Sequence, residues 1–278
     1  NSYENLRDGG LRSLQPVSSY NEDYHIFQTT KEEDVMRAVR NGLYGAGIPV
    51  ENSKGEADAG QEELNYKYSD ALDTADNHTI IKNGIKEIAW TKGRSVTFMA
   101  KYDHKKAGSS SHIHQSLWSL DGKPSFEDHD DVHGMSATMK HYIAGQLAHA
   151  RDITAFLAPY VNSYRRYVRD HAAPINLAWG RDNRTTGIRV PLSGPVSRRV
   201  ENRLAGMDCN PYLGIAVSLA CGYLGLMEEK RAGPSFKGDA YEGDGDIPRT
   251  MGEALDVLAE STALHEVLGP KFIRVYSI

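Results

Sequence analysis

Apolar residues recur every three or four positions in several stretches of the chain, which is the spacing of an amphipathic helix. The first such stretch follows Thr30, where Thr30 and Glu33 match a capping box, and it ends near Gly45. Similar patterns predict helices over residues 69–90, 134–157, 211–230 and 250–264. The last of these begins with a second capping box, formed by Thr250 and Glu253.

Shorter segments between the predicted helices favour strands. Leu64, Tyr66 and Tyr68 alternate with polar residues and therefore share one face of an extended segment. Further extended segments are predicted over residues 48–50, 96–101, 111–120, 186–190 and 199–204. Strands joined by helices and hairpins predict an α+β fold, which we expect to form one catalytic-type domain over residues 1–278.

The composition is that of a globular protein. The chain has 278 residues, of which 40% are hydrophobic, so enough apolar surface is present to bury a large core. A net charge of −5 argues against a general nucleic-acid binder, and no run reaches the ~20 apolar residues that span a bilayer. Only Cys209 and Cys221 are present, which excludes a disulfide framework and favours a reducing compartment. We therefore expect a cytoplasmic protein without nucleic-acid or membrane partners.

Arginine takes the place of lysine between Asn162 and Arg203, where every basic residue other than histidine is an arginine. These arginines are residues 165, 166, 169, 181, 184, 189, 198, 199 and 203. The guanidinium group offers a planar fork of donors that matches phosphate and carboxylate oxygens. The segment therefore predicts an anion-binding surface, and surface salt bridges are the alternative.

Three charged residues alternate along one predicted strand. On an extended segment Arg199, Glu201 and Arg203 project from the same face, so two cations and a carboxylate line one wall. If the wall is buried, its charges need an anion or a metal ion to complete it. If the wall lies on an exposed edge strand, the charges are solvated and do not indicate a bound anion or metal ion.

Two pairs of residues are candidate metal ligands. His112 and His114 share a strand face, and imidazoles so placed either bind one metal ion together or divide between a metal ion and a phosphate. Glu56 and Glu63 flank a turn at Gly60, and their hard oxygens suit Mg²⁺ or Mn²⁺. Carboxylates, histidines and arginines together indicate nucleotide-dependent phosphoryl transfer, in which catalysis rests on positioning and on charge neutralisation.

Six longer motifs follow one another along the chain. They are GIPVENSKGEADAGQEEL (47–64), TFMAKY (97–102), AGSSSHIHQSL (107–117), NSYRR (162–166), AWGRDNRTTGIRVP (178–191) and RRVENRLAGMDCNPYL (198–213). In this order the sequence resembles the catalytic domain of the glutamine synthetase family. The resemblance implies the α+β fold of that domain, a curved antiparallel sheet that forms a partial barrel and is flanked by helices.

The resemblance also implies two metal sites. Glu56 and Glu63 would bind the metal ion that supports glutamate activation, and His112 and Glu201 would bind the metal ion on the transferred phosphate. His114 would assist in binding the nucleotide phosphates. The implied cofactor is Mg²⁺ or Mn²⁺, with ATP as a co-substrate.

Further residues would bind the substrates. By the resemblance, glutamate would be held by Gly108, Arg166 and Arg203. The ATP phosphates would be neutralised by Arg184, Arg189 and Arg199, the first two acting as catalytic residues. The implied reaction is formation of γ-glutamyl phosphate followed by attack of an amine or ammonia. The family also implies a homo-oligomer, a dodecamer, for the full-length protein.

The chain departs from the family pattern at three positions. Ala172 stands where ammonia-using members carry a catalytic glutamate, and Asp170 or His171 are the residues that could replace it. Ala107 and Ser110 replace an asparagine and a glycine of the glutamate-binding segment. Together these differences resemble the branch that joins glutamate to larger amines, such as polyamines, methylamine or ethanolamine, because alanine leaves room for a carbon chain.

The resemblance also suggests missing segments. The family's Glu-x-Glu strand and its N-terminal β-grasp domain would precede residue 1, and members usually continue beyond the equivalent of Ile278. We therefore expect a domain truncated at both ends, with little activity of its own. Tyr241 falls near a tyrosine that some bacterial members adenylylate, but its surroundings favour an unmodified loop tyrosine.

One main hypothesis and three alternatives follow. The main hypothesis is an ATP-dependent γ-glutamyl-amine ligase, and a glutamine synthetase that uses ammonia is the alternative within the enzyme class. A catalytically silent structural or regulatory family member is favoured by Ala107 and Ala172 and opposed by the many paired charges. A polyanion-binding module is opposed by the negative net charge.

Overall fold

The computed structural model describes residues 3–10, 13–169, 173–243 and 245–277. It contains both helices and strands, which confirms the α+β class. Packing divides the chain into two compact units, Asn1–Phe98 and Met99–Ile278. The single domain expected over residues 1–278 stays a prediction.

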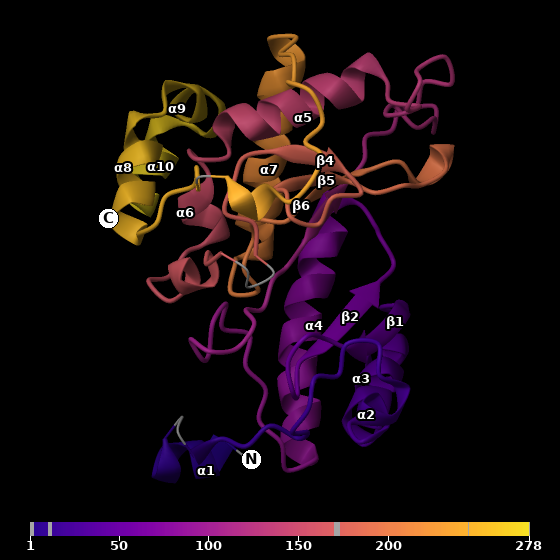
Figure 1. Ribbon diagram of the computed structural model, residues 1–278, viewed down its shortest axis with the longest axis vertical. Coiled ribbons are helices and arrows are strands. Elements are labelled where there is room, and N and C mark those ends of the chain that lie inside the picture. The colour runs from indigo at the N-terminus through magenta and orange to yellow at the C-terminus, as the bar shows by residue number, and fades with distance from the viewer. Residues whose placement is uncertain (1–2, 11–12, 170–172, 244, 278) are drawn as a thin grey trace. The chain divides into compact units, whose positions relative to one another are not determined.

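The first unit contains a two-stranded antiparallel sheet and the longest helix (Figure 1). Its elements are α1 (Tyr3–Gly9), α2 (Ile26–Thr30), α3 (Glu33–Gly45), β1 (Val50–Gly55), β2 (Glu62–Tyr66) and α4 (Ala71–Thr91). Val39, Leu43, Ile48 and Ile81 form its buried apolar cluster. These residues come from α3, the turn between α3 and β1, and α4, so the apolar face predicted for the first helix is the face that packs.

The capping box predicted at Thr30 is wrong. Thr30 ends α2, and its hydroxyl donates to the carbonyl of Ile26 at 3.1 Å. Helix α3 begins at Glu33, with Glu32 as its N-cap residue, and the Glu32 side chain makes no capping hydrogen bond. A short helix immediately before α3 therefore takes the threonine away from the cap position.

The second unit contains a four-stranded sheet and the remaining helices. Its elements are β3 (Ile113–Gln115), α5 (Ala137–His149), α6 (Thr154–Leu157), the 3-10 helix η2 (Ser163–Arg166), β4 (Trp179–Arg181), β5 (Ile188–Val190), the 3-10 helix η3 (Pro195–Ser197), β6 (Val200–Asn202), α7 (Pro211–Met227), the 3-10 helix η4 (Ala240–Glu242), α8 (Met251–Glu260), α9 (Thr262–Leu268) and α10 (Pro270–Tyr276). The strand order is β3-β6-β5-β4. The pairings of β6 with β3 and with β5 are antiparallel as expected, but β4 and β5 are parallel.

Several extended segments are shorter than predicted. The strand expected over residues 96–101 is absent from this described part of the chain, and the main chain of Lys101 bonds instead to a side chain. The N–H of Lys101 donates to Asn162 Oδ1 at 3.1 Å, and its carbonyl accepts from Asn162 Nδ2 at 2.7 Å. The strand expected over residues 111–120 is reduced to β3.

Two predicted helices are each divided in two. The pattern over residues 134–157 becomes α5 and α6, and that over 250–264 becomes α8 and α9. Ser261 ends α8 in an extended conformation and caps α9 by accepting from the N–H of Leu264. The cap at Thr250 is confirmed, since its hydroxyl accepts from the N–H of Glu253 at 3.2 Å. No helix in the described ranges is long and apolar enough to cross a membrane.

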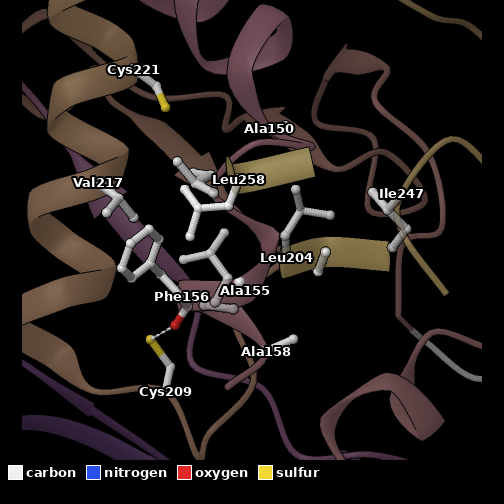
Figure 2. Packing of buried hydrophobic residues seen from close by; sticks show 14 of the residues in the cluster. Ala150, Ala155, Phe156, Ala158, Leu204, Cys209, Val217, Cys221, Ile247 and Leu258 are labelled. Atoms are coloured by element: carbon white, nitrogen blue, oxygen red, sulfur yellow. Dashed lines mark hydrogen bonds between the residues drawn. The ribbon is translucent and has the colours of Figure 1, made fainter. Parts of the chain in front are cut away.

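The main apolar cluster of the second unit lies beside the end of β6. Figure 2 shows Leu204 in this cluster together with Phe156, Val217 and Leu258. Leu204 is 2% exposed and directly follows Arg203, so packing fixes the backbone next to a charged residue of the predicted site. Cys209 Sγ donates to the carbonyl of Phe156 at 3.4 Å, and both cysteines of the chain are buried and reduced.

Helices α5 and α7 meet at glycines. A Cβ atom placed on Gly145 would lie 2.6 Å from the main-chain nitrogen of Gly225, which is closer than van der Waals contact allows. Gly84, in contrast, lies in α4 with open space around its Cα. Glycine is therefore required by packing in α5 and not in α4.

We predict opposite effects of alanine at these two positions. Gly145→Ala forces the helices apart and should lower the free energy of unfolding by about 1–3 kcal/mol. Gly84→Ala removes a flexible residue from a helix interior and should raise it by up to about 1 kcal/mol. Denaturant unfolding of both variants measures the difference, and equal stability of the two would contradict the close packing of α5 on α7.

Candidate active site

Glu201 lies at the centre of the charged residues of the second unit. It occupies the middle of β6, paired with His114 on β3 and with Arg189 on β5. Its side chain is 2% exposed. Because β6 has a neighbour on each side, Glu201 does not lie on an exposed edge; Glu201 and Arg203 of the predicted wall are buried, and Arg199 is partly exposed.

Four side chains converge on the Glu201 carboxylate. Arg189 Nη1 donates to Oε2 at 2.7 Å, and Arg203 Nη1 donates to Oε1 at 2.6 Å. His112 Nδ1 lies 3.1 Å from Oε1, and His114 Nε2 lies 4.0 Å from the same oxygen. The fold thus brings together residues that are as far apart as 91 positions in the sequence.

The surroundings of Glu201 fix its charge. Burial disfavours the carboxylate, but the hydrogen bond with His112 and the charge of Arg203 hold its pKa well below the usual range. Burial lowers the pKa of His112, and burial with the charge of Arg199 lowers that of His114 to about 4. Both imidazoles are therefore neutral near pH 7, the form in which histidine binds metal ions.

The atoms around Glu201 fit a divalent cation. His112 Nε2 is buried and has no hydrogen-bond partner within the described residues. Its Nδ1 faces Glu201, an arrangement common in metal sites, where one ring nitrogen binds the ion and the other donates to a carboxylate. Each carboxylate oxygen of Glu201 can also accept more than one interaction. His112 and Glu201 therefore form a donor set suited to a metal ion.

Arg199 and Arg189 are each fixed by hydrogen bonds to neighbouring side chains. Arg199 Nε donates to His114 Nδ1 at 3.0 Å, which places the proton of the neutral ring on Nε2. Arg189 bridges Glu201 and Asp182, to which its Nε and Nη2 donate at 3.1 and 2.5 Å. Such anchored guanidinium groups present fixed positive charge, as phosphate binding requires.

Asp182 is a site residue that the sequence analysis missed. It adopts a left-handed conformation with φ 51°, and its N–H donates to the carbonyl of Val190 at 2.8 Å. The available signal was that Asp182 is the only acidic residue in the motif over residues 178–191. The predicted catalytic residue Arg184 lies in the same loop, between β4 and β5, with an exposed side chain.

The predicted glutamate-binding residues Gly108, Arg166 and Arg203 lie together. Arg166 is 2% exposed, and its Nη1 and Nη2 donate to the carbonyls of Leu204 and Arg203, each at 2.8 Å. A Cβ atom on Gly108 would lie 2.8 Å from Arg166 Cγ, so only glycine permits this approach. Arg166 therefore holds the backbone of Arg203 in place, and its contact with glutamate stays a prediction.

The predicted ligands Glu56 and Glu63 meet in the first unit. Lys54 Nζ lies 2.9 Å from Glu56 Oε2 and 3.2 Å from Glu63 Oε2. Lys54 and Glu63 are directly paired across the β1–β2 hairpin, and the N–H of Glu56 donates to the carbonyl of Gln61 at 2.7 Å. Lys54 was not singled out from the sequence, although its spacing of two from Glu56 on a strand was a signal.

The two carboxylates share one environment. Burial and the hydrogen bond with Glu63 raise the pKa of Glu56. For Glu63, burial is outweighed by the hydrogen bond with Glu56 and the charge of Lys54, which lower its pKa to about 2. Two close carboxylates that need a cation between them are a donor set that fits Mg²⁺ or Mn²⁺.

Other predicted positions are less informative. Asp170, His171 and Ala172 lie outside the described residues. Ala107 and Ser110 lie in the segment that enters β3, where Ser110 pairs with Gly206 as an isolated β-bridge. Tyr241 lies on η4 and packs against the main apolar cluster.

The fold, the charged residues around Glu201 and the Glu56–Glu63 pair occur in a chain whose sequence matches a known family. Residues 7–278 match the family model described as glutamine synthetase, catalytic domain. The chain therefore belongs to the glutamine synthetase catalytic-domain family.

Three relatives with known names are similar to this chain in sequence. The chain is 40% identical over 276 residues to gamma-glutamylethanolamide synthetase GlnA4 of Streptomyces coelicolor, covering 99% of this chain and 59% of that protein. It is 37% identical over 270 residues to glutamate–isopropylamine ligase of a Pseudomonas species, covering 96% and 59%. It is also 37% identical over 245 residues to glutamine synthetase of Methanococcus maripaludis, covering 85% and 55%. The chain thus spans somewhat over half the length of these relatives.

A solved structure agrees with the fold. The structure described as apo GmaS without ligand superposes with a TM-score of 0.81 and 30% sequence identity. The match covers 91% of this chain and 61% of the other. The glutamine synthetase-type catalytic fold expected from the sequence is confirmed.

We predict that the buried guanidinium of Arg166 is required for stability. Arg166→Met removes the guanidinium donors to the carbonyls of Arg203 and Leu204, of which Leu204 keeps the Tyr167 hydroxyl, and this should cost about 2 kcal/mol or more in the free energy of unfolding. Arg165→Met is the matched control, because Arg165 is the exposed neighbour and its loss should cost less than about 0.5 kcal/mol. Denaturant unfolding measures both, and equal stability would show that the two hydrogen bonds do not support the site.

Proposed function

We propose that the protein containing this chain is an ATP-dependent ligase that forms a γ-glutamyl amide from glutamate and an organic amine. An oxygen of the glutamate γ-carboxylate bonds to the γ-phosphorus of ATP as the bond to ADP breaks, which gives γ-glutamyl phosphate. The amine nitrogen then bonds to the γ-carbon, phosphate leaves, and the nitrogen loses a proton. Two relatives, a gamma-glutamylethanolamide synthetase and a glutamate–isopropylamine ligase, support this class of reaction.

The observation that carries the proposal is the environment of Glu201. A buried carboxylate held by Arg189, Arg203 and His112 is costly unless it serves a charged ligand. In the family fold, this group suits the neutralisation of a phosphoryl group in transit. A purely structural role would be met equally well by apolar residues.

Each residue has a proposed part in the reaction. Bound Mg²⁺ or Mn²⁺ would polarise phosphate oxygens and neutralise their charge. Glu56, Glu63, His112 and Glu201 would hold these ions. His114, Arg184, Arg189 and Arg199 would bind the ATP phosphates, with Arg184 and Arg189 stabilising the charge that develops. Gly108, Arg166 and Arg203 would shape the glutamate site, Arg166 by fixing the position of Arg203.

The choice of nucleophile rests on Ala172. An alanine at this position supplies no carboxylate to accept a proton from ammonium, and its small side chain leaves room for a carbon chain. We therefore favour a primary amine, with ethanolamine, methylamine, isopropylamine and polyamines as the class to test. Ammonia is the second candidate, because glutamine synthetases are among the similar proteins. A homo-oligomer, a dodecamer by the family resemblance, and a cytoplasmic location complete the proposal.

Phosphate release from ATP by the full-length protein tests the nucleophile. With glutamate and Mg²⁺, we expect stimulation by at least one of methylamine, ethanolamine, isopropylamine, putrescine and spermidine, and little by ammonium. Stimulation by ammonium alone would identify a glutamine synthetase. No release with any nucleophile, from protein shown to be folded, would favour the catalytically silent alternative.

Ala172→Glu is a variant designed to reverse the preference. The added carboxylate fills the space proposed for the amine carbon chain, so amine-stimulated release should fall at least about tenfold, equivalent to about 1.4 kcal/mol. Ammonium-stimulated release should fall less or increase. Unchanged amine use by this variant would show that position 172 does not line the amine site.

A further inference from the structure

Three carboxylates outside the catalytic set converge inside the first unit. Oxygens of Glu22, Glu32 and Glu62 all lie within 4.8 Å of one another. Glu22 is fully buried and Glu32 is 4% exposed, while Glu62 is half-buried on β2. Acidic residues are almost never buried without a compensating partner, so this group requires an explanation.

The carboxylate of Glu32 has no hydrogen-bonding partner beyond this group in the described structure. Glu32 is the N-cap residue of α3, yet its side chain makes no capping bond. Its buried oxygen Oε1 has no hydrogen-bond partner, and the same holds for Glu22 Oε2 and Glu62 Oε1. The groups that act on Glu32 are the other two carboxylates, which with burial raise its pKa to about 10. The Glu32 side chain is therefore buried and directed into the cluster.

The cation that acts on Glu62 also serves other groups. Arg40 is the cation that lowers the pKa of Glu62, although burial raises that pKa overall. The guanidinium of Arg40 donates to Glu33 Oε1 at 2.5 Å and to Ser53 Oγ at 2.8 Å. The cluster thus lacks a dedicated protein cation among the described residues.

The local backbone is built to bring these carboxylates together. Glu62 pairs directly with Gly55 across the hairpin, and a Cβ atom on Gly55 would lie 2.6 Å from the Cβ atom of Glu22. Glycine at this position therefore allows Glu22 to approach β1. Ser18 Oγ and the N–H of Gly60 both donate to Glu22 Oε1, the latter at 2.8 Å, and orient the carboxylate.

We propose that Glu22, Glu32 and Glu62 bind a hard divalent cation. Three carboxylates are ligands that Ca²⁺, Mn²⁺ and Mg²⁺ prefer, and one oxygen from each of them lies within 4.8 Å of the other two, close enough for all three to contact one ion. The competing explanation is a shared proton. A single proton joins only one pair of oxygens at a time, whereas a cation takes one oxygen from each of the three carboxylates at once.

The proposed ion would stabilise the loop between β1 and β2. Glu22 binds the N–H of Gly60 within that loop, and Glu62 is next to Glu63. The loop also carries Glu56, so an ion in the cluster would fix the spacing of the two carboxylates proposed for the catalytic metal. Its role is positional, because none of the three residues belongs to the proposed catalytic set.

Counting bound ions in the full-length protein tests the proposal without relying on turnover. We expect Glu32→Gln to bind one Mn²⁺ or Ca²⁺ fewer per protomer than the wild type in equilibrium dialysis. Glu51→Gln is the matched control, since Glu51 is exposed on β1, and its count should equal that of the wild type. Equal counts for Glu32→Gln and the wild type, with both ions, would overturn the proposal.

A second measurement needs no variant. Crystals of the wild type soaked in Mn²⁺ should show an anomalous difference peak between Glu22, Glu32 and Glu62, separate from any peak at Glu56 and Glu63. A peak at Glu56 and Glu63 without one in the cluster, combined with no loss of Ca²⁺ in Glu32→Gln, would assign the cluster to shared protons. Because neither measurement involves catalysis, failure here leaves the proposed ligase activity unaffected.

Discussion

A buried negative charge at Glu201 is the constraint on which the second unit depends. Removing a carboxylate from water is costly, and the cost is offset only where donors and cations are held in place around it. Arg189 and Arg203 supply the charge, and the neutral ring of His112 supplies a hydrogen bond. Each of these groups is in turn fixed by the fold, Arg203 through the contacts of Arg166 with its backbone carbonyl. The stability of the unit and the anion binding proposed for it therefore have the same origin.

The first unit also holds carboxylates that need compensating positive charge, but it has fewer cations around them. Its hairpin places Glu56 and Glu63 around a single ammonium group, that of Lys54, and a divalent ion would neutralise these carboxylates more completely. The proposed cation among Glu22, Glu32 and Glu62 would extend this arrangement to the interior of the unit. In both units, the backbone brings carboxylates together next to positively charged groups. In the proposed function, bound metal ions supply part of that positive charge.

Many helices and the charged residues around Glu201 could be predicted from the sequence, because helical and period-two spacing indicate which residues share a face. The wall around Glu201 was found in this way, and the family motifs supplied the proposed roles. Interactions between distant segments left no such pattern. Asn162 occupies the main-chain groups of Lys101, where a strand was expected, and the short helix before α3 removes Thr30 from its predicted cap. Asp182 was missed because its partner Arg189 comes from the next strand.

The most direct test of this account is the effect of Mn²⁺ on ATP binding by the full-length protein, with Glu201→Gln compared with the wild type by calorimetric titration. The glutamine keeps the shape of the side chain but removes the charge that organises the arginines and His112. The account predicts that Mn²⁺ strengthens ATP binding by the wild type and that Glu201→Gln loses at least about tenfold of this gain, equivalent to about 1.4 kcal/mol. A folded Glu201→Gln protein that keeps the full Mn²⁺ effect would contradict the central role of this carboxylate.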